Sequence, residues 1–306
     1  MPHSGLNCKV SANLVLASHG RSERDTLAAP KHLMIQTRDR HNLHDIPLVF
    51  FDLETTGLDL GDGHRVCEVA LLRVRGGMVE DYLGALTRPG RRLDPQAAKV
   101  NGFNDDELAA AQPFSAVAGR VVALCRGAVM IAHNLPFDMA FLSAELARIG
   151  LPALSSPSLD TLALARRLLR RSSYSLASLA ADLRLPIPSH RALSDVLALR
   201  GLFTHLQSAM AELGVVTLDD SLRLERGLLP GMAELGAPPL IARALAEGRA
   251  LVIRYRSRGS PEAITRTIRP LYLTRESNGT YLRAYCELRQ DVRSFVLDKI
   301  EAAELQ

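Results

Sequence analysis

The chain has 306 residues, a length that indicates two domains rather than one. Apolar residues make up 47% and charged residues 23% of it, which is the balance of a soluble globular protein. No apolar run approaches the ~18 residues of a membrane span. The four cysteines are far apart and form no C-x-x-C pair, which argues against a disulfide framework and a cysteine zinc site. We therefore expect a cytoplasmic protein without a membrane partner.

The net charge is only +4, but the basic residues are mostly arginine: of 37 Lys and Arg, four are Lys. Arginine favours bidentate contacts with phosphate. A GC-rich genome would produce the same bias, so composition alone does not identify a nucleic-acid-binding protein.

Residues 1–46 show no sustained hydrophobic period and are rich in Ser, Arg, Asp and His. Five of the nine histidines fall here without the spacing of metal ligands. We interpret this segment as a disordered N-terminal extension rather than a metal site.

From residue 47 the pattern sharpens. PLVFFDL (47–53) predicts a strand, and the next two apolar runs predict a hairpin that turns at Gly76-Gly77. Helices are expected around 104–110 and 115–126, a strand over 128–134, and helices over 137–150, 159–169, 175–183 and 190–203. Three strands followed by mixed strands and helices favour a mixed sheet with helices packed against it.

Residues 207–239 contain Gly and Pro that interrupt any long helix, and we expect a linker there. A short helix over 240–248 precedes four strand-like runs separated by turn signals such as Ser277-Asn278-Gly279. Residues 240–306 therefore predict a second, small β-rich domain.

Two carboxylates stand at the end of the first predicted strand. Asp52 and Glu54 are two residues apart and therefore share one face of it. Two unit charges ~4 Å apart repel by roughly 4 kcal/mol at an effective dielectric of about 20. Such a pair beside a core is costly unless a cation joins it, although a solvent-exposed strand end would also explain it.

Further candidates follow along the chain. Asp138 lies just after a buried strand in the first turn of a helix, where the helix dipole alone would also favour an acid. His190 and Asp195 are five residues apart, about 140° around a helix, so they cannot share one helical face. This spacing predicts His190 at or before the helix start and Asp195 inside, beside Val196.

The motifs D-x-E-T-T-G (52–57), H-N-x-x-F-D (133–138) and H-x-x-x-x-D (190–195) occur in this order over about 150 residues. Together they resemble the DEDDh branch of the DnaQ-like exonucleases, and the likeness covers residues 47–205. It implies an α/β domain over 47–206 with an RNase H-like mixed sheet flanked by helices. It also implies hydrolysis of phosphodiester bonds at the 3′ end of mainly single-stranded DNA or RNA.

The resemblance assigns roles to specific residues. Two Mg²⁺ or Mn²⁺ ions, which prefer oxygen ligands, are expected on four carboxylates: Asp52, Glu54, Asp138 and Asp195. His190 is expected to be the general base. Thr55 and Thr56 are expected to meet the 3′ end, and Leu58 to pack on a base.

Residues 240–306 resemble a WYL domain, a small Sm- or SH3-like β-barrel, with Thr280-Tyr281-Leu282 in place of the Trp-Tyr-Leu triplet. The resemblance implies that this domain binds nucleic acid or a nucleotide and regulates or tethers the nuclease. The residues expected to bind are Tyr255, Arg266, Arg289 and Arg293. Alternatively, these arginines are surface charge on a packing or dimerisation module.

Two other functions stay open at this stage. The first is a proofreading subunit of a DNA polymerase. The second is a ligand-responsive regulator whose nuclease fold merely binds nucleic acid. The sequence does not choose between DNA and RNA, because discrimination of the 2′-hydroxyl depends on pocket shape, and it leaves the oligomeric state undetermined.

Overall fold

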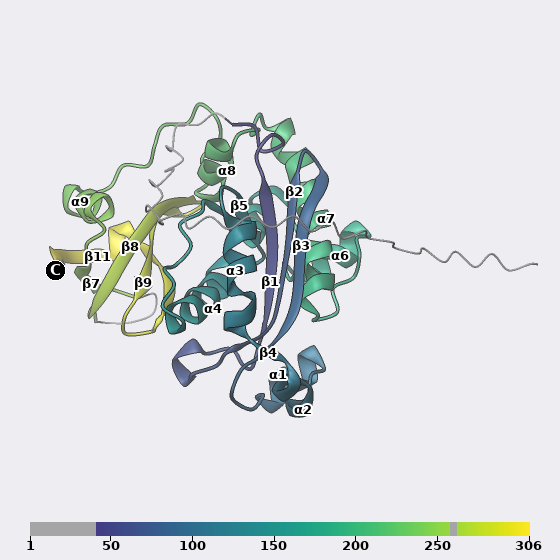
Figure 1. The fold of residues 1–306 in the computed structure, drawn as a ribbon. Coiled ribbons are helices and arrows are strands. Elements are labelled where there is room, and N and C mark those ends of the chain that lie inside the picture. The colour runs from purple at the N-terminus through teal and green to yellow at the C-terminus, as the bar shows by residue number, and fades with distance from the viewer. Residues whose placement is uncertain (1–40, 258–261) are drawn as a thin grey trace, which may run out of the picture. The chain divides into compact units, whose positions relative to one another are not determined.

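The computed structural model describes residues 41–257 and 262–306 (Figure 1). Most of the predicted N-terminal extension, residues 1–40, lies outside the described residues. Residues 41–46 differ from the expectation of disorder. Leu43 is 3% exposed and its N–H donates to the Val216 carbonyl at 3.1 Å, while Asn42 forms an isolated β-bridge with Thr217. Residues 42 and 43 are therefore held in place ahead of the first strand.

The first sheet has six strands in the order β4-β3-β2-β1-β5-β6. Their bounds are β1 Leu48–Thr55, β2 Val66–Arg75, β3 Met78–Arg88, β4 Gln112–Pro113, β5 Val129–Ala132 and β6 Ser158–Asp160. β1, β2 and β3 pair antiparallel, whereas β1 with β5, β5 with β6 and β3 with β4 are parallel. The mixed sheet and the hairpin at Gly76-Gly77 are confirmed.

Both faces of β1 are buried, which explains its nearly continuous apolar sequence. Leu48 and Phe50 contribute to a core cluster with α5, α6 and α7. Val49 and Phe51 contribute to a second cluster with α3 and α4 on the other face. Figure 1 shows α3 and α4 on one side of the sheet and α6 and α7 on the other.

Six of the helices in this part, α2 to α7, follow the expected order, whereas α1 was not expected and α7 extends beyond the expected end at residue 203. Their bounds are α1 Pro95–Asn101, α2 Asp105–Ala110, α3 Phe114–Cys125, α4 Leu135–Arg148, α5 Thr161–Leu168, α6 Leu176–Leu183 and α7 Ala192–Glu212, with a 3₁₀ turn η1 at Leu60–Asp62. The longest, α7, packs against β1 through an edge-to-face contact between Phe203 and Phe50, whose ring centroids are 5.6 Å apart.

The segment 207–239 holds more regular structure than a linker. α7 continues to Glu212, and a further helix, α8, covers Leu218–Glu225. Leu218 and Leu224 are buried in the core cluster that contains α7. Although glycine and proline interrupt this segment, the apolar spacing within α8 is sufficient to fix it on the core cluster that contains α7.

The C-terminal part consists of α9 (Pro239–Glu247) and an all-antiparallel five-stranded sheet in the order β10-β9-β8-β7-β11. The strands are β7 Leu251–Tyr255, β8 Ile264–Glu276, β9 Gly279–Cys286, β10 Asp291–Val296 and β11 Ile300–Leu305, with a 3₁₀ turn η2 at Leu297–Lys299. Ile241 of α9 packs against sheet residues that include Ile253 and Phe295. The predicted fold class, a mixed α/β sheet followed by a small β domain, is confirmed.

Strand β11 is the one element of this domain that the sequence did not indicate. Its residues, IEAAEL, include Ala and Glu, which are depleted in strands. Pairing with β7 overrides this preference. Across the described part of the chain, none of the helices combines the length and apolar character needed to cross a bilayer.

Candidate active site

The carboxyl end of β1 presents the first two acids on the face covered by α7. Asp52 and Glu54 continue the alternation of Leu48 and Phe50, so they point toward the same side of the sheet. Both are half-buried. The register between β1 and β2 shifts just after Glu54, and such a bulge bends the strand and ends regular pairing next to the two acids.

Asp138 reaches the same strand from α4. It is 4% exposed, and its Oδ1 accepts a hydrogen bond from the Leu53 N–H at 3.1 Å. α4 begins after Asn134, whose left-handed backbone (φ 69°) turns the chain sharply from β5 into the helix. The hydrogen bond therefore fixes Asp138 against the backbone between the two acids of β1.

His190 and Asp195 lie around the start of α7 as their spacing predicted. His190 is exposed and precedes the helix, with a left-handed backbone (φ 55°). Asp195 is 6% exposed, beside the fully buried Val196, and its Oδ1 accepts from the Ser189 N–H at 2.9 Å. A non-glycine residue with positive φ is uncommon, and strained backbone of this kind concentrates at functional sites.

Side chains from two separate segments converge here. Potential ligand atoms of Glu54, His190 and Asp195 all lie within 4.8 Å of one another. Asp52 and Asp138 join this group electrostatically: the pKa of Asp52 is well above its usual range because of burial first and the Asp138 carboxylate second.

The other carboxyl groups are perturbed in the same direction. Burial, followed by repulsion from Asp195, raises the pKa of Glu54 to about 8. Burial also raises the pKa of Asp138 to about 8, and it raises that of Asp195 against the opposing effect of the Ser189 N–H. A cluster of acids with uncompensated repulsion is the environment that a cation would stabilise.

The donor set fits hard divalent ions. Four carboxylates surround the end of β1, and Mg²⁺ and Mn²⁺ prefer such oxygen ligands to nitrogen or sulfur. The imidazole of His190 offers a ligand atom within 4.8 Å of those of Glu54 and Asp195.

Two residues beside the acid cluster, Glu68 and Arg191, were given no role by the sequence analysis. Glu68 on β2 pairs directly with Glu54 across the sheet and is 7% exposed. Its Oε2 accepts from the Ala192 N–H at 2.8 Å and lies 3.5 Å from Nε of Arg191. The Arg191 guanidinium also stacks 4.6 Å from the Phe103 ring centroid. Glu68 and Phe103 thus hold the residue next to His190 from two sides.

The sequence did contain a signal for Glu68. An acid in a strand that is buried on both faces is unusual. Its pairing with Glu54 belongs to the register of β1 with β2, which the hairpin between β2 and β3 does not fix. No comparable signal marks Arg191, because its partners come from elements distant in the chain.

The expected substrate residues differ in how they are placed. Thr56 is fully buried, and its hydroxyl lies 3.0 Å from His64 Nδ1 and accepts from the Arg65 N–H at 3.0 Å. The Thr55 hydroxyl donates to the Gly57 carbonyl at 2.8 Å. Both threonine side chains therefore shape the loop after β1. Leu58 is 81% exposed and available to a base, so its contact with substrate stays a prediction.

The four residues expected to bind ligand in the C-terminal domain line one cavity of about 170 Å³. They are Tyr255, Arg266, Arg289 and Arg293, joined by Ser257, Ser294 and Phe295. The rings of Tyr255 and Phe295 meet edge to face at 5.0 Å. Nε of Arg266 is buried and finds no hydrogen-bond partner among the described residues. A buried unpaired donor is costly, which makes an acceptor on a bound ligand favourable.

Comparison with known proteins identifies the larger domain. A family model described as "Exonuclease" matches residues 49–203, half of the chain. The chain belongs to this exonuclease family. A WYL domain model matches residues 238–305, so the exonuclease domain is followed by a WYL domain.

Relatives of the exonuclease domain include parts of much longer proteins. The chain is 29% identical over 188 residues to a DNA polymerase III PolC-type of Thermotoga maritima, covering 61% of this chain and 14% of that protein. It is 32% identical over 181 residues to a DNA polymerase III subunit epsilon-like protein of Rhodobacter capsulatus, covering 57% and 26%. The chain thus spans about a quarter or less of these relatives.

Among solved structures, a zinc-bound complex of E. coli ExoI with single-stranded DNA aligns with a TM-score of 0.52 at 17% identity. The alignment covers 78% of this chain and 54% of that one. A second structure, apo exonuclease I, gives the same TM-score and covers 85% of this chain and 64% of that one. At this level of identity the likeness establishes the fold.

Proposed function

We propose that residues 47–206 form a metal-dependent 3′→5′ exonuclease that hydrolyses phosphodiester bonds at the 3′ end of mainly single-stranded DNA or RNA. The observation that carries this proposal is the convergence of Glu54, His190 and Asp195 within 4.8 Å in a chain of the exonuclease family. Membership in the family alone would allow an inactive relative. An intact cluster of acids with raised pKa values supports a working catalytic centre.

In this proposal Asp52, Glu54, Asp138 and Asp195 hold two Mg²⁺ or Mn²⁺ ions. When bound, such ions neutralise negative charge on the reacting phosphate and lower the pKa of a water molecule. The protein contributes rigidity, because two of the acids are fixed on β1 and Asp138 is hydrogen-bonded to the same strand. Rigid positioning of this kind lowers the cost of aligning the reacting groups.

His190 is proposed to accept the proton of the attacking water. An imidazole titrates near neutral pH and is therefore able to accept and release a proton under physiological conditions. Its side chain is exposed at the edge of the acid cluster, where substrate and water have access. Two acids hold the segment that carries His190. Asp195 accepts from the Ser189 N–H, and Glu68 contacts Ala192 and Arg191.

An end-labelling assay tests the polarity and the chemistry together. Single-stranded DNA and RNA with a 5′ label are incubated with Mg²⁺ or Mn²⁺, beside the same strands closed into circles. The proposal predicts a ladder that shortens from the 3′ end and no cleavage of the circles. Shortening from the 5′ end, or cleavage of the circles, would contradict it.

For the WYL domain we propose binding of nucleic acid or a nucleotide in the cavity lined by Tyr255, Arg266, Arg289 and Arg293. The buried, unpaired Nε of Arg266 supports an anionic or acceptor-rich ligand. Affinities for mononucleotides and short strands would be compared for the full-length protein and its Arg266→Gln variant, with exposed Arg275 on β8 as the Arg275→Gln control. Equal affinities in all three proteins would remove this assignment.

Proofreading for a DNA polymerase is the second candidate function. It is favoured by the names of the relatives from Thermotoga maritima and Rhodobacter capsulatus. Excision of a mispaired 3′ terminus that accelerates when a replicative polymerase is added would support it. Excision at an unchanged rate would leave the independent exonuclease as the better description.

A further inference from the structure

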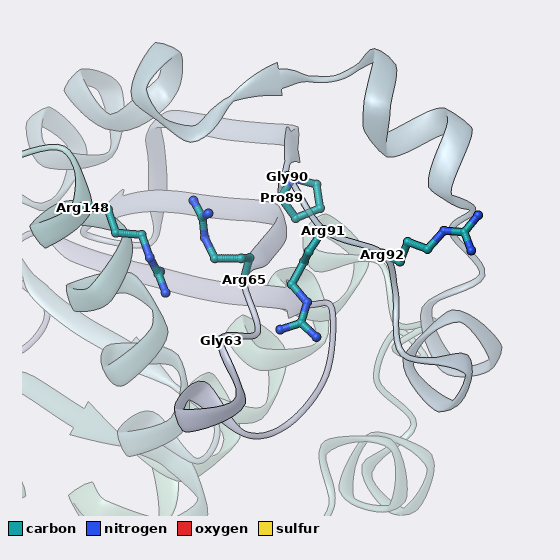
Figure 2. Close-up of a pocket in the computed structure, with 7 residues that line it drawn as sticks. All are labelled: Gly63, Arg65, Pro89, Gly90, Arg91, Arg92 and Arg148. Atoms are coloured by element: carbon teal, nitrogen blue, oxygen red, sulfur yellow. The ribbon is translucent and has the colours of Figure 1, made fainter.

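Four arginines line a pocket of about 450 Å³ (Figure 2). Arg65 follows the η1 turn, Arg91 and Arg92 come from the connection between β3 and α1, and Arg148 ends α4. The lining contains no acidic residue. We call this surface the arginine pocket.

The arginine pocket is joined directly to the loop that follows the catalytic strand. The Arg65 N–H donates to the Thr56 hydroxyl at 3.0 Å, and the Thr56 N–H donates to the Arg65 carbonyl at 2.9 Å. Thr56 is two residues beyond Glu54. Any movement of this loop would therefore move the arginine and the catalytic strand end together.

Helix α4 gives the spacing between the pocket and the catalytic centre. It carries Asp138 and, two turns later, Glu145, which are separated by about 10 Å along the helix axis. Glu145 is 1% exposed and accepts from Nε and Nη2 of Arg65 at 2.6 and 2.8 Å. This bidentate contact ties one guanidinium of the pocket to a position on α4 that lies about 10 Å along the helix axis from Asp138.

The positive charge of the arginine pocket is only partly compensated. Arg65 and Arg148 share the single carboxylate of Glu145. Arg92 is 3.3 Å from Asp105 across an exposed contact, where ion pairs contribute little. The contact of Arg91 is with a neutral carbonyl, that of Asp62, at 2.8 Å.

Two acids in the adjoining loops are engaged with helix ends instead. Asp59 accepts from the Gly61 N–H at the start of η1, and Asp94 accepts from the Gln96 N–H at the start of α1, both at 2.7 Å. Neither lines the pocket. Arg65, Arg91 and Arg148 thus keep guanidinium donors that these two acids do not occupy, whereas the Arg92 side chain points away from them (Figure 2).

We propose that the arginine pocket binds backbone phosphates of the substrate strand, on nucleotides that lie behind the scissile bond. This inference rests on the exonuclease function proposed above and extends it to a second contact region. A separation of about 10 Å corresponds to roughly three nucleotides at a stacked rise of 3.4 Å. Guanidinium groups match phosphate oxygens bidentately, and because Arg65 is already held by Glu145, little side-chain freedom is lost when a strand binds.

The binding of such a strand would be independent of base sequence, because phosphate contacts carry no sequence information. It would depend on strand length, since a dinucleotide at the catalytic centre is too short to reach the pocket. It would also depend on salt. For a single strand, each phosphate contact steepens the plot of the logarithm of the binding constant against the logarithm of salt concentration by about 0.7.

The test compares full-length wild type with Arg91→Gln and Arg148→Gln. Arg126→Gln is the matched control, because Arg126 is exposed at the end of α3, just before β5 begins and therefore at the opposite end of the sheet from the acids. Affinities for a dinucleotide and for oligothymidylate of about 12 nucleotides are measured with Ca²⁺ over a salt series. Thermal unfolding confirms that each variant is folded.

We expect each pocket variant to lower the affinity for the long strand on the order of tenfold, several times more than for the dinucleotide. We also expect the salt slope for the long strand to decrease by about 0.7, with wild-type behaviour for the control. Equal losses on both lengths, an unchanged slope, or the same losses in Arg126→Gln would overturn the inference. Failure of the wild type to degrade strands would instead count against the proposed exonuclease, because binding is measured here without cleavage.

Discussion

Replacing Asp138 by asparagine should stabilise the metal-free protein. The carboxyl group is buried, its pKa is raised to about 8, and one oxygen accepts from the Leu53 N–H. An asparagine side chain has nearly the same shape and keeps an oxygen for that hydrogen bond, while it removes the ionisable group. Asp138→Asn therefore isolates the cost of the carboxyl group from the cost of a cavity.

The size of this stabilisation follows from the difference between the pKa of Asp138 in the folded state and its pKa in the unfolded state. In the unfolded chain an aspartate has a pKa of about 3.9, so between that value and about 8 the unfolded state releases a proton that the folded state retains. The folded protein therefore loses stability as pH rises through this window. At 1.36 kcal/mol for each pH unit, the cost is about 4 kcal/mol at pH 7 and about 1–2 kcal/mol at pH 5.

Urea unfolding of wild type and Asp138→Asn in EDTA measures this difference directly. We expect the variant to be more stable, with an advantage that grows from about pH 5 to about pH 8 and then levels off. Added Mn²⁺ should stabilise the wild type and have much less effect on the variant. A variant that is less stable at pH 7, or an advantage independent of pH, would refute the reasoning.

Three other substitutions probe the proposed general base, the residue that supports its segment, and the core. His190→Gln should lower kcat at least about 100-fold while the stabilisation by Mn²⁺, followed by thermal unfolding, stays as in wild type. Glu68→Ala, which leaves the Ala192 N–H without its acceptor, should lower kcat by about 10- to 100-fold; Glu68→Gln, which keeps an acceptor, should lose less in the same assay. Phe203→Ala, which removes a fully buried ring packed on Phe50, should lower the free energy of unfolding by about 3–5 kcal/mol in urea.

The sequence was informative where local pattern and tertiary structure agree. The apolar run of β1 and the glycine pair of the first hairpin define their elements without help from distant residues. The spacing of His190 and Asp195 was enough to place one before α7 and the other inside the protein. In these cases the periodicity of a helix or strand decides which way a side chain points.

Other features depend on contacts that no local pattern encodes. Arg191 contacts Glu68 from β2 and the ring of Phe103 from the α1–α2 connection. The arginine pocket brings together three segments of the chain, two of which are linked by the contacts of Glu145 with Arg65 and Arg148. Strand β11 forms against β7 in spite of its composition. Each arises from packing between segments that are distant in the chain. For β11 this packing overrides the low strand propensity of its residues.

Calorimetric titration with Mn²⁺ tests the convergence of the acids most directly. It is carried out at about pH 8, close to the pKa of Glu54 and Asp138, so that metal binding does not have to displace protons from fully protonated carboxyl groups. The account predicts about two bound ions per wild-type chain and a clear loss of binding in Asp52→Asn, with both proteins equally folded. Wild-type protein that binds no Mn²⁺, or an Asp52→Asn variant that binds it as tightly as wild type, would contradict the account.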